Sequence, residues 1–273
     1  MEIPTLVVSD PPHGVVDVGS AAELLGLDLA GTRLKVKFPA PEVLSASDER
    51  EAREFAAELR GTGLSAAVIH GGRLDDVPWP DPVTALAFDD DGLTASLSNE
   101  DVHLSYGQPV LGVFCKPPAG FSMKSTVNVL EAMERGDGPR IAEGIQWMTI
   151  LDLYFREGGR VRRISVVPGL ADFSSLGPLR GATSAETMRS ILEECTARFD
   201  DIELDTRLED VRPRQRFIMG EAGFDPDLRK RYSFGTLLLC HILDSISAEL
   251  RDVPQYELGS RLAYALSGFG RSR

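Results

Sequence analysis

The amino-acid sequence predicts an α+β protein with two domains, on three observations. Residues 145–167 carry a period-two apolar pattern that reverses at a pair of glycines, as in a β-hairpin. Residues 32–115 read as a β-α-β segment followed by an antiparallel meander, and the last third of the chain contains several amphipathic helical patterns. With 273 residues, 42% of them hydrophobic and 26% charged, the composition is that of globular protein long enough for two domains.

The hairpin is the most distinctive stretch of the chain. Its first strand places apolar residues and one threonine on a single face, namely Ile145, Trp147, Thr149, Leu151, Leu153 and Phe155. Gly158 and Gly159 supply the positive φ of a tight reversal, and the return strand runs from 160 to 167. Because an isolated hairpin is only marginally stable, we expect helices to cover it in a C-terminal domain spanning residues 121–273.

The first 120 residues divide into an arm and a small domain. Residues 1–31 contain a short strand (5–8) and a short helix (21–27), and are interpreted as an arm that docks on another domain or subunit. The small α/β domain is expected over 32–116. It begins with a strand at 33–38, a helix after Ser47 and a strand at 64–69. The meander follows over 83–115, and the prolines of the 116–120 segment mark a domain boundary.

The C-terminal half supplies the predicted helices. A helix is expected over 121–135, and Thr183 and Glu186 match the capping box that opens a helix ending near Phe199. Residues 200–215 read as a polar connection. A helix over 233–250 is apolar nearly all round and therefore predicted to be central to the core, and a last helix spans 255–266.

Charge is distributed unevenly along the chain. Residues 1–120 contain 8 basic and 19 acidic residues and residues 121–273 contain 21 and 23, so −11 of the net −13 falls in the first part. Such an acidic half disfavours nucleic acid and anionic membranes as partners. The sequence has no apolar run of about 18 residues and no secretory signal pattern, and we therefore expect a cytoplasmic protein. Its three cysteines are scattered, which predicts reduced, buried thiols.

Motifs for catalysis or metal binding are missing from the sequence. The four histidines and three cysteines have no zinc spacing, no phosphate-binding glycine motif occurs, and the acids at 89–91 lack the calcium-loop pattern. We therefore assign no catalytic residue, metal or cofactor. The candidate anion- or partner-binding residues are clustered cations of the second half: Arg160, Arg162, Arg163, Arg212, Arg214, Arg216, Arg229, Lys230 and Arg231. Asp152, in mid-strand, is a candidate buried acid for which Arg162 or Arg163 is the structural partner.

Three hypotheses about function follow from these patterns. The first is a non-catalytic interaction, regulatory or adaptor protein that binds a protein partner or itself, including as a subunit of a larger, bacterial-type assembly. The alternative is an enzyme that acts on a small anionic metabolite through an arginine and aspartate site. The third is nucleic-acid binding by the C-terminal half.

Overall fold

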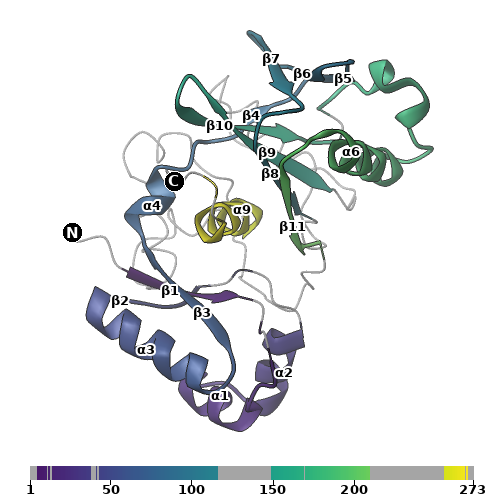
Figure 1. Cartoon of the computed structure of the whole chain (residues 1–273). Coiled ribbons are helices and arrows are strands. Elements are labelled where there is room, and N and C mark those ends of the chain that lie inside the picture. Colours follow the sequence, from purple (N-terminus) through teal and green to yellow (C-terminus); the bar gives the residue numbers. More distant parts are fainter. Residues whose placement is uncertain are drawn as a thin grey trace, which may run out of the picture. The chain divides into compact units, whose positions relative to one another are not determined.

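A computed structural model of the chain describes residues 5–10, 12, 14–37, 41, 43–115, 149–168, 170–209, 255–267 and 269 (Figure 1). They form two compact units. The first contains the described residues up to Val77 together with those at 255–267, and the second contains the described residues from Pro78 to Glu209 together with Phe269. Helices and several sheets occur together, and antiparallel meander pairing is present, so the predicted α+β class is confirmed.

The first unit is built on a three-stranded antiparallel sheet in the order β2-β1-β3. β1 (Thr5–Asp10) lies between β2 (Val43–Ser47) and β3 (Ser65–His70). α3 (Glu49–Gly61) packs on one face of this sheet, where its residues Ala52, Ala56 and Leu59 share a core with Val7 and Ala66. Asp48 caps α3 by accepting a hydrogen bond from the backbone N–H of Glu51, which satisfies one of the free amides of the first turn.

Two expectations about the N-terminus are corrected. Residues 1–31 are not an arm, because β1 is the central strand and Leu6, Val7 and Val8 are fully buried. The strand expected at 33–38 is instead part of helix α2 (Leu29–Lys37), which follows α1 (Val18–Leu25). The carboxylate of Asp28 accepts the N–H of Gly31 at the start of α2, and this local cap favours a helix over the alternating pattern.

The C-terminal helix belongs to the first unit. α9 (Gln255–Leu266) has the predicted bounds and packs against α4 (Gly72–Asp75). The fully buried Arg261 donates from Nη1 to the carbonyl oxygens of Leu74 and Val77, each at 2.7 Å. Arg261 therefore joins helix α9 to a segment more than 180 residues earlier and satisfies carbonyls where α4 ends.

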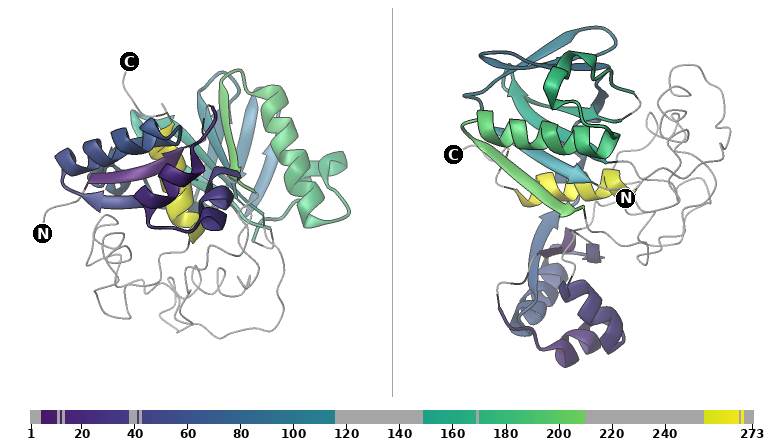
Figure 2. Two further views of the ribbon diagram at one scale, coloured as in Figure 1. Left: turned by 90° about the horizontal axis from the view of Figure 1, so that it is seen from below. Right: turned by 90° about the vertical axis from the view of Figure 1, so that its right-hand side faces the viewer.

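The second unit is built on a five-stranded sheet in the order β11-β8-β9-β10-β4, labelled in Figure 1. Figure 2 shows the strands of this unit from two further sides, coloured from blue through teal to green. β9 (Ile150–Glu157) and β10 (Arg160–Val166) form the predicted hairpin, with Gly158 and Gly159 at φ of 56° and 81° in the turn. β8 (Val110–Cys115) pairs with β9 in antiparallel fashion, whereas β11 (Ile202–Leu208) and β4 (Asp81–Pro82) add in parallel at the edges.

Helix α6 (Ser184–Arg198) covers one face of that sheet. Its residues Met188, Ile191 and Cys195 lie in one core cluster with the apolar face of β9. The predicted capping box is confirmed, since Thr183 and Glu186 each accept a hydrogen bond from the other's backbone N–H. A 3₁₀ helix, η1 (Ser174–Leu179), precedes α6.

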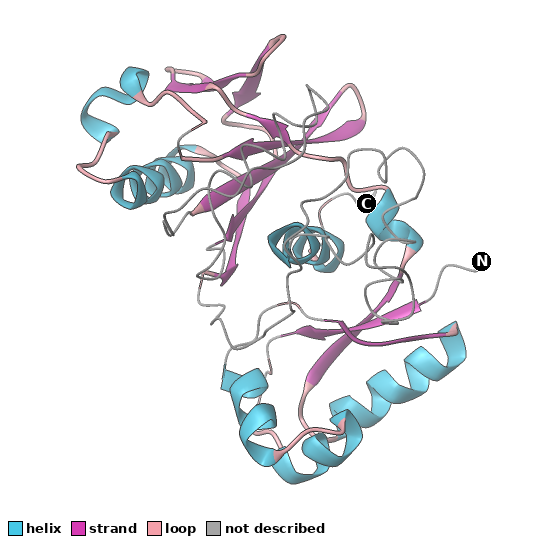
Figure 3. Ribbon diagram, turned by 180° about the vertical axis from the view of Figure 1, so that it is seen from behind, coloured by secondary structure: helices cyan, strands magenta, loops and turns pink. Residues whose placement is uncertain are grey.

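A second sheet of this unit is the meander β5 (Ala85–Phe88), β6 (Gly92–Ser96) and β7 (Asp101–Ser105), with strands drawn in magenta in Figure 3. These three strands match the predicted meander, but the strand expected at 110–115 does not belong to it, because β8 pairs with β9 and β11 in the five-stranded sheet. The inward side chains join the core of the five-stranded sheet; they are Leu86, Leu93, Ala95, Val102 and Leu104. The opposite face of the meander carries small, polar or charged side chains.

Residues 200–215 are not simply a connection, because 202–208 form β11. Ile202, Leu204 and Leu208 alternate with Glu203, Asp205 and Arg207. Glu203 is exposed, whereas Asp205 is buried and forms an ion pair with Arg207 at 2.5 Å. The expected domain boundary at 116–120 also differs from the structure. β8 ends at Cys115 and pairs with β9, so the strands on both sides of that segment share one sheet, and the units divide after Val77.

The expected helices at 121–135 and 233–250, and residues 145–148 of the first hairpin strand, lie outside the described residues. Cys115 and Cys195 are buried as expected, and burial raises the pKa of the Cys195 thiol to about 12. Across the described ranges, we find no helix with both the length and the hydropathy to cross a membrane.

The loop between α3 and β3 offers a test of the first unit. Gly63 has a φ of 88°, and a Cβ there would lie 2.3 Å from the carbonyl oxygen of Val15. Gly63→Ala should therefore lower the free energy of unfolding by about 2 kcal/mol or more in urea titrations. Gly61→Ala is the matched control, because a Cβ at Gly61 meets nothing within 4 Å and alanine favours a helix end. Equal effects of the two substitutions would contradict this account.

Candidate functional site

The candidate acid, Asp152, lies at the centre of the five-stranded sheet and is fully buried. Its Oδ2 atom lies 2.6 Å from Nη2 of Arg163, which is also fully buried, and its Oδ1 atom accepts a hydrogen bond from the hydroxyl of Ser165. Ser165 is directly opposite Asp152 in the β9–β10 ladder, and Arg163 precedes Ser165 by two residues on β10, on the same face of the sheet.

Aromatic packing accompanies this ion pair. Tyr154 stands directly opposite Arg163 in the ladder, and the Arg163 Cζ atom lies 5.3 Å from the centroid of the Tyr154 ring. A guanidinium over an aromatic face gains electrostatic attraction in addition to its hydrogen bonds. Because Asp152 and Arg163 are both closed off from solvent and bonded to each other, the arrangement has the character of a structural pair, and it gives a ligand no direct access.

The neighbouring arginines of β10 face differently. Arg162 is on the opposite side of the strand from Arg163 and contacts three carboxylates: Glu100 at 2.7 Å, Glu157 at 2.8 Å and Asp81 at 3.3 Å. These contacts, led by that with Glu157, raise the pKa of the Arg162 guanidinium. Arg160 is exposed at the hairpin turn. The three arginines of this predicted cluster therefore do not converge on one anion.

The other candidate cations lie outside the described residues. They are Arg212, Arg214, Arg216, Arg229, Lys230 and Arg231. Their role as an anion- or partner-binding set stays a prediction.

A surface that the sequence did not single out is the outward face of the meander, which we call the meander face. It comprises the outward side chains of β5–β7 and of the turns that join them. Along β7 the residues alternate between exposed and buried, so Asp101, His103 and Ser105 point outward. β7 pairs only with β6 among the described strands, so one of its edges has no described neighbour.

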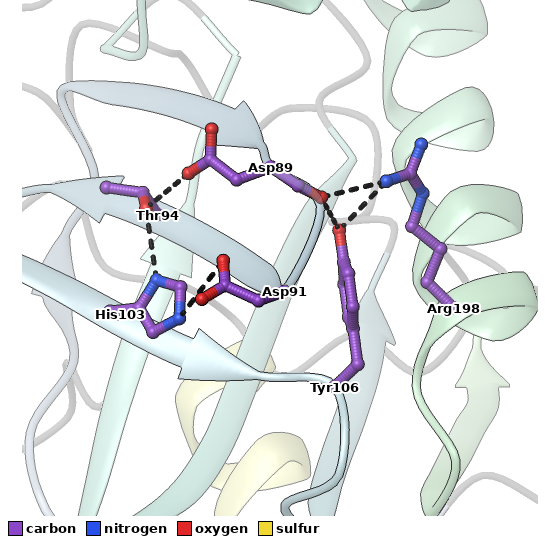
Figure 4. A network of polar contacts seen from close by, with 6 residues as sticks. All are labelled: Asp89, Asp91, Thr94, His103, Tyr106 and Arg198. Atoms are coloured by element: carbon purple, nitrogen blue, oxygen red, sulfur yellow. Dashed lines mark hydrogen bonds and ion pairs between the residues drawn. The ribbon is translucent and has the colours of Figure 1, made fainter.

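A polar network crosses this face (Figure 4). The hydroxyl of Thr94 on β6 donates to Asp89 Oδ2 at 2.9 Å and lies 3.3 Å from Nδ1 of His103, its direct neighbour on β7. The Nε2 atom of His103 is 3.9 Å from Oδ1 of Asp91. A Cβ at Gly92 would lie 2.5 Å from the His103 ring, so glycine at that position makes room for the imidazole.

An arginine from α6 anchors the edge of this network. Arg198 Nη1 donates to the carbonyl oxygen of Asp89 at 2.9 Å and contacts the Tyr106 hydroxyl at 3.1 Å (Figure 4). Its guanidinium also lies over the rings of Phe88 and Tyr106. Burial raises the pKa of the Tyr106 hydroxyl, which itself donates to the carbonyl of Asp89. Helix α6 thus fixes the turn that carries the three acids 89–91.

The order of hydroxyl, imidazole and carboxylate in this network invites comparison with a nucleophilic triad, but the geometry does not suit one. The Thr94 hydroxyl directs its proton to Asp89, and its contact with His103 is the longer of the two. His103 is 45% exposed and Asp91 is 84% exposed, so water reaches both groups. Triad chemistry depends on an enclosed, preorganised site. The network is better described as a polar patch suited to contact with another surface.

The surrounding segment is uniformly acidic. Residues 78–115 contain six carboxylates and no lysine or arginine. Arg162 contacts two of them, Asp81 and Glu100. Asp90 and Asp101 are exposed and have no ion pair with any described residue. No cluster of three or more potential metal ligands occurs among the residues that the structure describes.

Sequence reasoning missed the meander face because its contacts follow from strand register. Thr94 and His103 are nine residues apart, a spacing that fits no motif, and they meet only because β6 and β7 pair. The available signal was the period-two alternation of 101–105 together with the missing basic residues of 78–115.

Comparisons with known proteins gave no match: no family model, no curated protein and no solved structure is significantly similar to this chain.

The buried pair provides a second test. Asp152→Ala or Arg163→Met should each lower the free energy of unfolding by about 3–5 kcal/mol, because each leaves one buried charge without its partner. The double variant should lose clearly less than the two single losses added together, as measured in a urea double-mutant cycle. Arg162→Gln is the control and should cost about 1 kcal/mol or less, since its three carboxylates are more than half exposed. Additive single losses would contradict the pairing.

Proposed function

We propose that this chain is a non-catalytic adaptor that binds another protein through the meander face, and that the partner contributes a basic, extended segment. The single observation behind this proposal is an exposed sheet face, next to a strand edge without a described neighbour, in a segment of six carboxylates and no cations.

Charge supports a basic partner. The exposed Asp90 and Asp101 have no ion pair with described residues, and Asp89 and Asp91 in the same turn are also exposed. A single-sign surface attracts a partner of opposite charge over a distance of about a Debye length and repels a second copy of itself. Because like charges would face each other, this surface favours a different chain over self-association.

The strand edge supports an extended segment. β7 presents backbone groups on one edge without a described partner, and such edges bind added strands by main-chain hydrogen bonding. Its outward side chains Asp101, His103 and Ser105 are spaced two residues apart. They would therefore meet alternate side chains of the added strand, and a carboxylate at the end of that row selects for lysine or arginine.

The enzyme hypothesis depended on Asp152 acting with an arginine cluster. The full burial of Asp152 and its contacts with Arg163 and Ser165 support a structural role for that residue instead. The other arginines needed for nucleic-acid binding by the C-terminal half lie mostly outside the described residues.

The test uses the full chain and a set of labelled extended peptides with lysine or arginine at alternate positions. We expect salt-dependent binding by fluorescence anisotropy, weakened at least about tenfold, or ~1.4 kcal/mol, by Asp90→Lys with Asp101→Lys. The matched control is Glu193→Lys with Glu203→Lys, which changes the net charge equally at exposed positions of α6 and β11.

Either of two results would overturn the proposal. One is equal weakening by the two double variants, which would mean that binding senses only total charge. The other is concentration-dependent dimerisation of the wild-type chain in sedimentation experiments that Asp90→Lys with Asp101→Lys abolishes, which would make the meander face a self-association surface.

A further inference from the structure

A groove in the first unit is lined by a different set of charges. Its volume is about 440 Å³, and it lies between α3 and the edge strand β3. Six residues line it: Thr5, Glu49, Arg53, Arg60, Val68 and His70. None of them was a candidate in the sequence, and the groove is in the unit that does not contain the meander face.

The two elements bring these residues together by their periodicities. Glu49, Arg53 and Arg60 are four and seven residues apart and so lie along one side of α3. Val68 and His70 are two residues apart on β3 and point to the same face of the sheet. Thr5 is directly opposite His70 in the β1–β3 ladder, which places its side chain on that face as well.

Arg53 and Arg60 are each oriented by a hydrogen bond and keep further N–H donors for a ligand. Arg60 donates from Nε to the carbonyl oxygen of Ala66 at 3.0 Å, and among the described residues its two Nη atoms have no hydrogen-bond partner. Arg53 contacts Glu49 through Nε at 3.1 Å and Nη2 at 2.5 Å, and within the described ranges its Nη1 atom is not used. A guanidinium that is oriented through one nitrogen can direct the others at an oxyanion.

His70 adds a donor of defined tautomer. Its Nδ1 atom accepts a hydrogen bond from the backbone N–H of Gly72 at 3.2 Å. The ring proton must then be on Nε2, so the neutral imidazole presents an N–H donor there. Two arginines and one carboxylate give the groove a formal charge of +1 in a protein whose net charge is −13.

We propose that this groove binds the phosphate group of a small organic phosphate. The planar, multiple donors of Arg53 and Arg60 match the tetrahedral oxygens of phosphate, and Nε2–H of His70 adds a neutral donor. A volume of about 440 Å³ is in the range of pockets that hold whole metabolites. Val68 supplies an apolar wall for the uncharged part of the ligand.

Glu49 makes the proposal sharply testable. Its carboxylate is the one acidic group of the lining; it occupies part of Arg53 and repels a bound phosphate. Removing this charge should therefore tighten phosphate binding, although most substitutions in a binding site weaken it. Glu49→Gln keeps the side-chain size and leaves Asp48, the cap of α3, in place.

The experiment measures binding of inorganic phosphate and of phenyl phosphate to the full chain by isothermal titration calorimetry at constant ionic strength, with acetate as the carboxylate probe. We expect phosphate to bind, phenyl phosphate to bind more tightly, and acetate to bind at least tenfold more weakly. Arg60→Gln and Arg53→Gln should each weaken phosphate binding about tenfold, and Glu49→Gln should tighten it severalfold.

Arg50→Gln is the matched control. Arg50 is on the same helix, is similarly exposed and pairs with Glu54, but it does not line the groove. Its substitution should leave phosphate binding unchanged. Equal weakening by Arg50→Gln, weaker binding by Glu49→Gln, acetate binding as tight as phosphate, or no phosphate binding by the wild-type chain would each overturn the proposal. Arg53→Gln keeps the test informative if Arg60→Gln fails to fold, because both partners of the Arg53–Glu49 pair are largely exposed.

Discussion

The second unit depends on the burial of one ion pair, Asp152 with Arg163, in the middle of its sheet. Removing both charges from water costs several kcal/mol for each ion, and their close contact, together with the hydrogen bond from Ser165 to Asp152, offsets that cost. The pair spans the hairpin, so it also determines the register of β9 against β10. A slip by one residue would turn both charges into the apolar core that Leu151, Leu153 and Phe155 form with α6.

The same register places Arg162 where it connects to the meander. Consecutive residues of a strand point to opposite faces, so burying Arg163 leaves Arg162 to contact Glu100, in the turn before β7. At the other turn of the meander, Arg198 of α6 donates to the carbonyl of Asp89. Two arginines therefore hold the two meander turns, and the acids that they leave unpaired are the ones that we assign to a partner.

Most of the elements that could be predicted from the sequence were predicted from hydrophobic periodicity and from helix-capping residues. The hairpin, the meander, the Thr183–Glu186 capping box and the bounds of α9 are all local patterns in the chain. The errors came where a local pattern was ambiguous or tertiary contacts decided the outcome. Leu34 and Val36 alternate like a strand, yet the Asp28 cap starts a helix, and the charged alternation of 202–208 became an edge strand.

The phosphate groove and the Asp152 pair could likewise be predicted only in part, because tertiary contacts decide which side chains meet. Glu49, Arg53 and Arg60 are visibly one helical stripe in the sequence, but their meeting with His70 depends on how α3 lies against β3. Asp152 could be singled out, because an acid in an apolar strand needs a partner, and Arg163 was one of the two partners that the hairpin pattern offered. The choice between Arg162 and Arg163 followed from the strand ladder.

Opposite local charges allow the two proposed sites to work in one acidic chain. The Debye length is about 8 Å at physiological ionic strength, so exposed charges act mainly on their immediate surroundings. A phosphate in the groove would respond first to Arg53, Arg60 and Glu49, and a basic segment on the meander face to Asp90 and Asp101. The net charge of −13 opposes the first encounter and assists the second. Added salt screens the long-range effect of the net charge first. It must therefore slow the approach of a basic partner to the meander face, and it must lower the repulsion that opposes the approach of a phosphate to the groove.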